Sequence, residues 1–515
     1  MHYRPHFTMR DLERVLAQPL PVDFAFGVAT SGYQAEGGFN GPDEPKNNWY
    51  PHEQSGRVQR TGGACRLLEL WREDVQRAAA LGCRAFRLGI EWARVQPAVD
   101  PQQRGPADFD PAALDLYAEI LHGIREAGME PHPTLFHFVH PLWAGEDLWL
   151  HRDLCVPLFA QYACETIERL NTRLIERGSA PLQRIITINE PLMVPFATYV
   201  LKHFPGPSAD RGFGTAITAL ENNYLAHVEA VERLRGLYCE RGWERPLIST
   251  NSWSCCVYEL DRLPCDLLRA PAAGVGPREL DAYIGGLRQR HIQRMLDAPL
   301  SRSWPGVRRH FERRLQWWVT KLMGPRPFGA LRDRVLRSDE PLIDEVLLDY
   351  YDPFMLDYVD LGLRPQLRTE PWDWRFAPEG MGPILEGYAD GAADAPIGIV
   401  ENGMGLRHDG VRAHARRDGV QRDQALACSL YEVAKAVRAG IKIDRYYYWT
   451  LVDNYEWGSY EPRFGLYGVD YANGAQRMET DAAGVDAGRA YTELIEALQS
   501  GGREAVQVFA RRSGL

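Results

Sequence analysis

Residues 395–403, APIGIVENG, hold the pattern that decides the fold. Their apolar run has the length of a strand, stops at Glu401 and is followed by an asparagine–glycine pair, which is typical of a buried strand entering a loop. Residues 184–191, RIITINEP, have the same pattern and carry Asn189 and Glu190 to the end of a second strand, where a proline interrupts the ladder. Two glutamates presented alike from distant strands predict a shared site.

Strand-like runs alternate with helical patterns along the rest of the chain. One helix is expected to begin at Asp110, with Pro111 at its first position, and to end at Gly128. About eight strands separated by helices predict a single (β/α)8 TIM barrel with long βα loops over residues 1–515, with its active site at the carboxyl ends of the strands. The strands are expected within 22–30, 84–92, 129–138, 184–191, 247–250, 347–351, 396–400 and 445–452.

The composition bounds the class of protein. The chain has 515 residues, of which 45% are hydrophobic and 25% charged, so it can bury a large core. Its formal net charge of -10 argues against a nucleic-acid partner. The nine irregularly spaced cysteines fit no zinc motif and favour free thiols. Neither a signal peptide nor an apolar run of roughly 18 residues is evident, so we expect a cytoplasmic enzyme.

The two glutamates suit the cleavage of a glycosidic bond. This reaction needs one group to protonate the leaving oxygen and another to support the anomeric carbon, and two carboxyl groups about 5 to 5.5 Å apart do this with retention. Glu190 and Glu401 are candidates for these roles. Burial and a neighbouring negative charge favour a protonated acid, and a nearby cation favours an ionised nucleophile; Arg87, in the second strand, is the candidate cation.

Several motifs of this sequence resemble those of glycoside hydrolase family 1, the retaining β-glycosidases built on a TIM barrel. The resemblance extends over about 23–471 and weakens over about 297–341. In chain order, its motifs are FAFGVATSGYQAEGG (24–38), FRLGIEWARVQP (86–97), TLFHFVHP (134–141), TINEP (187–191), DYYDP (349–353), VENG (400–403) and YYYWTLVDNYEWGSYEPRFGLYGVDY (446–471).

The resemblance implies a role for each matching residue. It makes Glu190 the acid/base and Glu401 the nucleophile, with Arg87 beside the nucleophile and Tyr351 hydrogen-bonded to it. It implies no metal and no organic cofactor. The residues that it implies for sugar binding are Gln34, His137, Asn189, Trp449, Glu456 and Trp457.

Some positions depart from the family pattern. Phe138 and Val139 stand where the family has a tryptophan and an aspartate, and Asp349 stands where it has an asparagine. After Ala64 and Cys65, this chain has Arg66 and Leu67 where the family often has an aspartate and a histidine. We expect these changes to affect substrate choice and to spare the catalytic pair.

Residues 302–337 form a divergent basic insertion before the sixth strand. The simpler expectation is an amphipathic helix packed on the barrel, and the alternative is a surface for an anionic membrane or for the non-sugar part of an amphiphilic substrate. The apolar positions of this helix are Val307, Phe311, Leu315, Trp318 and Leu322, and its basic positions are Arg308, Arg309, Arg313, Arg314 and Lys321.

These patterns lead to one preferred function and two alternatives. We expect a retaining β-glycosidase for an unphosphorylated β-glucoside, β-galactoside or β-fucoside, since the carboxylate of Glu456 would repel a sugar phosphate. A transglycosylase with a sugar or lipid acceptor is the first alternative, and a non-catalytic carbohydrate-binding barrel is the second. The role of Glu91 stays open between support of the site and pairing with a structural cation.

Overall fold

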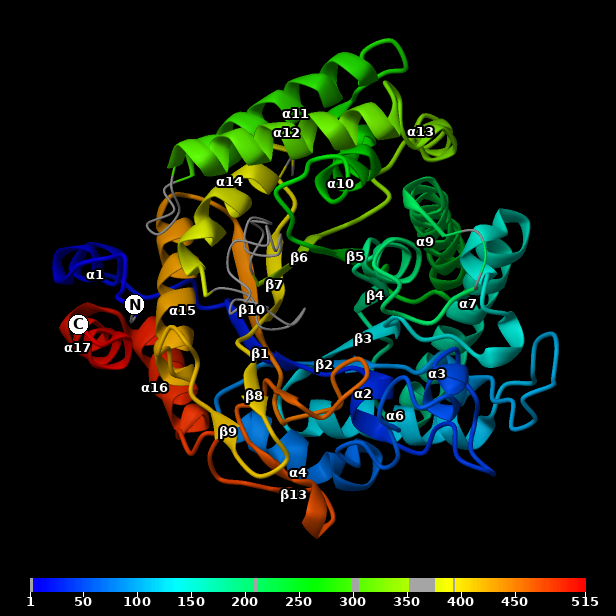
Figure 1. The fold of residues 1–515 in the computed structure, drawn as a ribbon, viewed down its shortest axis with the longest axis horizontal. Coiled ribbons are helices and arrows are strands. Elements are labelled where there is room, and N and C mark those ends of the chain that lie inside the picture. The colour runs from blue at the N-terminus through cyan, green and yellow to red at the C-terminus, as the bar shows by residue number, and fades with distance from the viewer. Residues whose placement is uncertain (1–2, 208, 210, 299–304, 352–375, 392–393) are drawn as a thin grey trace.

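The computed structural model describes residues 3–207, 209, 211–298, 305–351, 376–391 and 394–515. Within these ranges, eight parallel strands close into a barrel in the order β1-β10-β7-β6-β5-β4-β3-β2 (Figure 1). The predicted TIM barrel is therefore confirmed. The barrel strands are β1 (Ala25–Ala29), β2 (Ala85–Gly89), β3 (Glu130–Phe136), β4 (Arg184–Asn189), β5 (Leu247–Trp253), β6 (Val346–Tyr350), β7 (Ile397–Asn402) and β10 (Ile443–Trp449).

Helices surround the barrel, and short strands decorate its loops. Asp110 begins α6 as expected, since its side chain accepts a hydrogen bond from the backbone N–H of Ala112 at 2.8 Å. Gly128 follows the helix with φ of 81°, in the left-handed region that favours glycine. The helices are α1 (Met9–Val15), α2 (Gly32–Glu36), α3 (Tyr50–Gln54), α4 (Leu67–Ala80), α5 (Trp92–Val95), α6 (Pro111–Glu126), α7 (Arg152–Glu176), α8 (Met193–Pro195), α9 (Phe213–Arg241), α10 (Arg262–Arg269), α11 (Leu280–Asp297), α12 (Pro305–Met323), α13 (Gly329–Val335), α14 (Met381–Gly391), α15 (Arg422–Arg438), α16 (Ala487–Ser500) and α17 (Gly502–Ser513). The short strands are β8 (Leu406–His408), β9 (Ala413–His414), β11 (Pro462–Arg463), β12 (Val469–Asp470) and β13 (Gln476–Arg477).

The side chains of the barrel strands alternate between two packing layers. Val28 and Leu348 belong to the large cluster between the strands and the helices. Their neighbours Ala29 and Leu347 belong to a smaller cluster that gathers residues from most of the barrel strands. Alternation along each strand explains this division and identifies the smaller cluster as the interior of the barrel.

The described part of the basic insertion folds as helices α12 and α13 beside the barrel, and Figure 1 shows α12 alongside α11. The predicted helix is present as α12, but part of its predicted apolar stripe is wrong. Val319 is buried, whereas Trp318 and Leu322 are 49% and 48% exposed. The helix is anchored partly by polar contacts, because Gln316 and Thr320 both donate hydrogen bonds to buried Glu259. The predicted positions Val307, Arg308, Arg309 and Phe311 lie outside the described side chains.

Two sequence predictions concern the chain's environment. All nine cysteines lie within the described ranges, and they form no disulfide with one another. No helix in the described part of the chain has the length and apolarity needed to span a bilayer. The cytoplasmic location stays a prediction.

Candidate active site

Irregular pairing between β4 and β5 places the first glutamate. Ser249 pairs with Ile186, but Asn251, two residues later, pairs with Asn189 instead of Ile188. The extra residue in β4 is a β-bulge, which shifts the alternation of the side chains. Asn189 therefore occupies the inward position at the end of the strand, and Glu190 follows it in the left-handed region, with φ of 37°.

The second glutamate is placed by the same device. In the β6–β7 pair, Leu348 lies opposite Ile399, but Asp349 lies opposite Glu401 and not opposite Val400. One extra residue again stands in the strand that carries the glutamate. The two bulges bring the glutamates of β4 and β7 to the mouth of the barrel, where each side chain is about 95% buried.

Glu401 is buried, which raises its pKa overall, but its two hydrogen-bond donors favour the ionised form. Its Oε1 accepts a hydrogen bond from Nη1 of Arg87 at 2.5 Å, and its Oε2 accepts one from the hydroxyl of Tyr351 at 3.0 Å. Burial raises the pKa of Glu401, whereas the charge and hydrogen bond of Arg87 lower it. The guanidinium and the phenol thus oppose the cost of burying the carboxylate.

Glu190 lies in a setting that favours its protonated form. Burial is the largest cause that raises its pKa well above the usual range, and the negative charge of Glu401 is the next. An oxygen of Glu190, one of Glu401 and one of Asp349 all lie within 4.8 Å of one another. The two glutamates therefore differ as an acid and a nucleophile should.

A group of polar side chains lies beside the two glutamates. Gln34 donates from Nε2 to Oε2 of Glu456 at 2.9 Å, and Trp449 donates from Nε1 to Oε1 of the same carboxylate at 3.1 Å. Burial raises the pKa of Glu456 to about 8, and the charge of Glu401 adds to this. These three residues form a polar wall suited to sugar hydroxyls.

The remaining predicted sugar contacts lie between this polar wall and the two glutamates. The ring of His137 stacks on Trp449 and Trp457, with centroid distances of 5.6 and 5.8 Å. Asn189 lies 3.3 Å from Nε2 of the histidine through its Nδ2, and its Oδ1 accepts from Nη2 of Arg87 at 2.5 Å. All ten predicted site residues thus lie in one connected group.

Two residues that the sequence did not assign to the site also lie in it. The carboxylate of Asp349 is fully buried next to both glutamates. Asn251 donates from Nδ2 to Oδ1 of Asn189 at 2.6 Å and also to Asp349. Two features of the sequence could have indicated these residues. Asp349 replaces the asparagine of the family pattern, and the fifth strand ends in polar residues.

The structure answers the question about Glu91. Its Oε2 accepts from the backbone N–H of Tyr33 at 3.1 Å, and its Oε1 accepts from that of Ala93. Burial, and then the charge of Glu36, raises the pKa of Glu91 to about 8. The hydrogen bond from Tyr33 holds the short helix α2, which carries Gln34. Glu91 therefore supports the backbone next to a predicted sugar contact.

The altered third-strand positions are packed into this surface. Phe138, which has φ of 69°, contacts Trp457 and Phe204 with ring centroids 4.9 and 5.7 Å away. Burial lowers the pKa of His140 to about 4, so this histidine is neutral at pH 7. Phe138 therefore adds an apolar ring beside the predicted sugar contacts.

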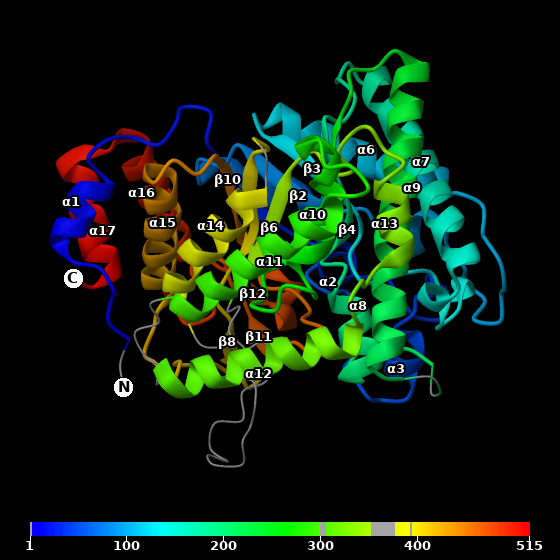
Figure 2. The same ribbon diagram turned by 90° about the horizontal axis from the view of Figure 1, so that it is seen from above.

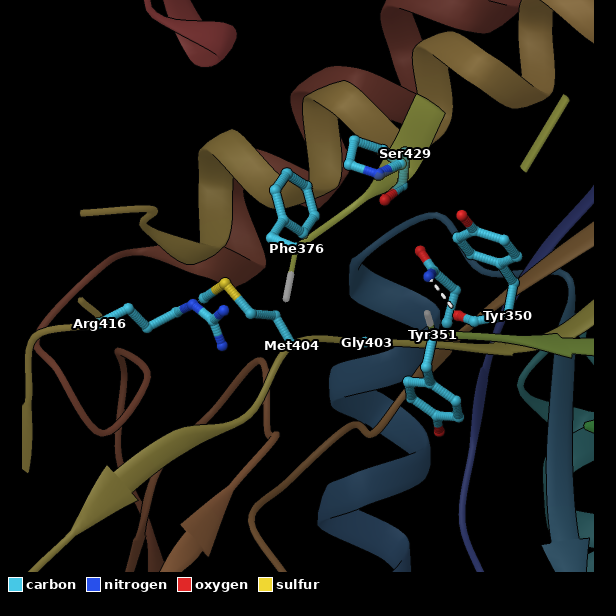
Figure 3. Close-up of a pocket in the computed structure, with 9 residues that line it drawn as sticks. Tyr350, Tyr351, Phe376, Gly403, Met404, Arg416 and Ser429 are labelled. Carbon is cyan, nitrogen blue, oxygen red and sulfur yellow. Dashed lines mark hydrogen bonds between the residues drawn. The ribbon is translucent and has the colours of Figure 1, made fainter. Parts of the chain in front are cut away.

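Figure 3 shows a small pocket behind the site, where Tyr350 and Tyr351 turn in different directions. Asn402 donates from Nδ2 to the carbonyl of Tyr350 at 2.6 Å, and its Oδ1 accepts from the hydroxyl of Tyr446 at 2.7 Å. These bonds link the end of β7 to the end of β6 and to the middle of β10. They fix the backbone that directs Tyr351 toward Glu401.

A parallel barrel with two adjacent buried carboxyl groups at the carboxyl ends of its strands is typical of glycosidases. The family model described as glycosyl hydrolase family 1 matches residues 16–252 and 353–498. The chain belongs to this family, and it is a β-glucosidase-like glycoside hydrolase. The unmatched residues 253–352 include helices α10 to α13 and also Asp349 and Tyr351.

Similar proteins cover nearly the whole chain. Beta-glucosidase 42 of Arabidopsis thaliana is 26% identical over 90% of this chain and 92% of its own length. A 6-phospho-beta-galactosidase of Clostridium acetobutylicum is 24% identical over 87% of this chain and 92% of its own. A beta-glucosidase from Thermotoga maritima in complex with deoxynojirimycin has the same fold, with a TM-score of 0.65 and 22% identity over 93% of this chain and 99% of its own.

Proposed function

We propose that this enzyme is a retaining β-glycosidase that hydrolyses an unphosphorylated β-glucoside, β-galactoside or β-fucoside through a covalent glycosyl-enzyme intermediate. The observation that carries the proposal is the approach of Glu190 and Glu401, whose nearest oxygens lie within 4.8 Å. Retaining glycosidases place their carboxyl groups about 5 to 5.5 Å apart, whereas inverting ones leave about 6.5 to 9.5 Å for a water molecule.

The surroundings of the two glutamates support a two-step mechanism. Glu401, held ionised by Arg87, attacks the anomeric carbon while Glu190 protonates the leaving oxygen. Formation of the ester removes the negative charge of Glu401, which was one cause of the raised pKa of Glu190. That pKa then falls, so Glu190 becomes a suitable base to activate water in the second step.

The polar wall favours a sugar without a phosphate group. Glu456 is held by Gln34 and Trp449 and has no cationic partner among these contacts. A sugar phosphate next to this carboxyl group would have no cation to pair with among these contacts, whereas a sugar hydroxyl would form a hydrogen bond with it. The relatives include beta-glucosidases and a 6-phospho-beta-galactosidase, and this contact favours the activity of the former.

A panel of aryl β-glycosides tests the proposal. Wild type should release phenol from at least one of the glucoside, galactoside and fucoside but not from their 6-phosphates, and Glu401→Gln should lose activity by about 10⁴-fold or more. Product analysis with added sugar or lipid acceptors separates hydrolysis from transfer. Equal inactivity of wild type and Glu401→Gln over the whole panel would contradict the proposal and favour the non-catalytic alternative.

We further propose that helix α12 binds an anionic lipid surface. Trp317 and Trp318 are 62% and 49% exposed, and Arg313 and Arg314 are exposed beside them. Lys321 lies over the ring of Trp317, with its ammonium 5.1 Å from the ring centroid. Tryptophan together with basic side chains on one helix suits the interface of an anionic membrane.

The position of α12 supports access from such a surface to the active site. Trp318 contacts Phe213 with ring centroids 5.8 Å apart, and Phe213 begins α9, which follows the carboxyl end of β4. Figure 2 shows α12 on the same side of the molecule as β8, β11 and α8, which belong to loops at the carboxyl ends of the barrel strands. A bound membrane would therefore lie near the mouth of the barrel.

Vesicle flotation tests this surface. Wild type should float with vesicles that contain phosphatidylglycerol and much less with phosphatidylcholine alone, and W317A/W318A and R313Q/R314Q should each reduce flotation. A matched variant, R57Q/R104Q/R503Q, removes exposed charge elsewhere and should float like wild type. Equal flotation of all variants would contradict the lipid surface and leave the amphipathic helix with a packing role.

A further inference from the structure

Three carboxyl groups meet in the active site, but the proposed reaction uses only two of them. One oxygen from each of Glu190, Asp349 and Glu401 lies within 4.8 Å of the other two, and all three side chains are buried. Among the described residues, Arg87 is the cation that contacts this group, and its Nη1 donates a hydrogen bond to Glu401. Three carboxylates with one guanidinium would carry a net charge of −2 in a buried space, which is costly without protons.

The closeness of the carboxyl groups favours a proton between two members of the group. An oxygen of Glu190 and one of Asp349 lie within 4.8 Å of each other in a buried space, where two ionised carboxylates would repel each other. We therefore expect one of the two to carry a proton. Proton sharing between adjacent carboxyl groups is the usual result when like charges lie so close.

Within the part of the chain that the structure describes, the other neighbours of Asp349 do not supply a second cation. From β5, Asn251 donates a neutral hydrogen bond to its Oδ2. Its Oδ1 is buried and has no donor among the described residues. The titratable and charged groups that face this cluster are Arg87 from β2, Glu190 from β4, Asp261 from the segment after β5, Tyr351 from the end of β6 and Glu401 from β7.

We propose that Asp349 holds a proton jointly with Glu190 and thereby sets the upper pH limit of catalysis, as a positioning residue that acts through the acid. This inference rests on the proposed roles of Glu190 and Glu401. Burial, followed by the charges of Glu401 and Glu190, raises the pKa of Asp349 well above its usual range, in agreement with the geometry. The pair should release its protons in two linked steps, and the negative charge left after the first step delays the second.

The sign of the effect on activity follows from this linkage. An ionised Asp349 makes loss of the proton from Glu190 harder, so the acid stays protonated to a higher pH. Asp349→Asn keeps the shape of the side chain and can still hydrogen-bond, but it removes that charge. The alkaline limb of the profile of kcat/KM against pH should therefore move to lower pH by about one unit or more.

Asp453→Asn is a matched control for the activity profile. Asp453 is also a buried aspartate, and burial raises its pKa to about 6, but it lies 3.7 Å from Arg463 and does not belong to the three-carboxyl group. Its replacement should leave the alkaline limb in place. A limb that stays unchanged in Asp349→Asn would overturn the coupling between Asp349 and Glu190.

A second measurement needs no substrate and so separates this inference from the proposed function. A carboxyl group with a raised pKa binds its proton more tightly in the folded state, so it reduces stability as pH rises from about 4, the unfolded pKa, to the folded pKa. The Tm of Asp349→Asn relative to wild type should therefore increase over that range. Asp349→Ser, which also lacks the carboxyl group, serves if the asparagine variant does not fold.

The outcomes of the stability measurement are decisive. Parallel curves of Tm against pH for wild type and both variants would overturn the claim that Asp349 holds a proton, whatever the activity. Added Ca²⁺ or Mg²⁺ should not change the Tm of wild type relative to Asp349→Asn. A rise confined to wild type would assign the three carboxyl groups to a cation and would also overturn the proposal.

Discussion

The mouth of the barrel and the α10–α13 helices hold their polar groups in different ways. At the mouth, the separate strands β2, β4 and β7 present Arg87, Asn189 and Glu401, and the bonds among these side chains follow from the register of the strands. In the helices, one buried carboxylate, Glu259, gathers donors from separate helices. Strand register therefore determines how the polar side chains at the mouth are arranged, whereas contacts between side chains hold helices α10 to α13 in place.

The largest effect that tests this comparison should come from Glu190→Gln. This change removes the acid but leaves the strand register intact, so the loss of kcat/KM should be about 10² to 10⁴-fold for a glycoside with a poor leaving group. A dinitrophenyl glycoside, which needs no protonation to leave, should lose far less. Steady-state kinetics over a series of leaving groups measures the difference, and an equal loss for all of them would contradict an acid role.

Tyr351→Phe should have an intermediate effect. The change removes the hydrogen bond to Oε2 of Glu401, and a bond to a charged group contributes about 1.5 to 3 kcal/mol, so kcat/KM should fall by about 10- to 100-fold. Tyr350→Phe is the matched control, because that hydroxyl donates to the carbonyl of Ala377, away from the nucleophile. Similar kinetics for the two variants would show that the hydroxyl of Tyr351 does not assist Glu401.

Glu259→Gln should change stability and leave the chemistry alone. Its Oε1 accepts from Nε of Arg288 at 2.6 Å and from the hydroxyl of Thr320 at 2.8 Å. Loss of this charge should lower the free energy of unfolding by about 1 to 3 kcal/mol and leave kcat/KM within about twofold. Denaturant unfolding measures this change in the free energy of unfolding, with Glu279→Gln at an exposed position as control. A large loss of kcat/KM would contradict the prediction and show that the helices influence the active site.

Much of the site could be predicted because strand ends have a readable pattern. The apolar runs before Glu190 and Glu401 stop at the glutamate, and a parallel barrel brings all such ends to one face. Arg87 and Tyr351 were predicted on their motifs and lie within hydrogen-bonding distance of Glu401. At Asp349 the sequence shows only a departure from the asparagine of the family pattern. Its role depends on two other carboxyl groups that are distant in the chain.

The error in α12 has a physical reason. The spacing of apolar residues indicated a stripe that included Trp318 and Leu322, because periodicity alone cannot tell which side of a helix meets the protein. In the structure, Gln316 and Val319 face inward, since Glu259 offers an acceptor there. The aromatic and basic side is exposed as a consequence.

The sequence alone determined the barrel, the order of its strands and the two glutamates, because hydrophobic periodicity and strand-end residues are local signals. Only the tertiary structure decided how the glutamates point. One bulge in β4 and one in β7 shift the alternation so that Asn189 and Glu401 take inward positions. These bulges arise where β4 pairs with β5 and β7 pairs with β6. The register of such a pair depends on both strands, so the sequence of one strand alone does not predict it.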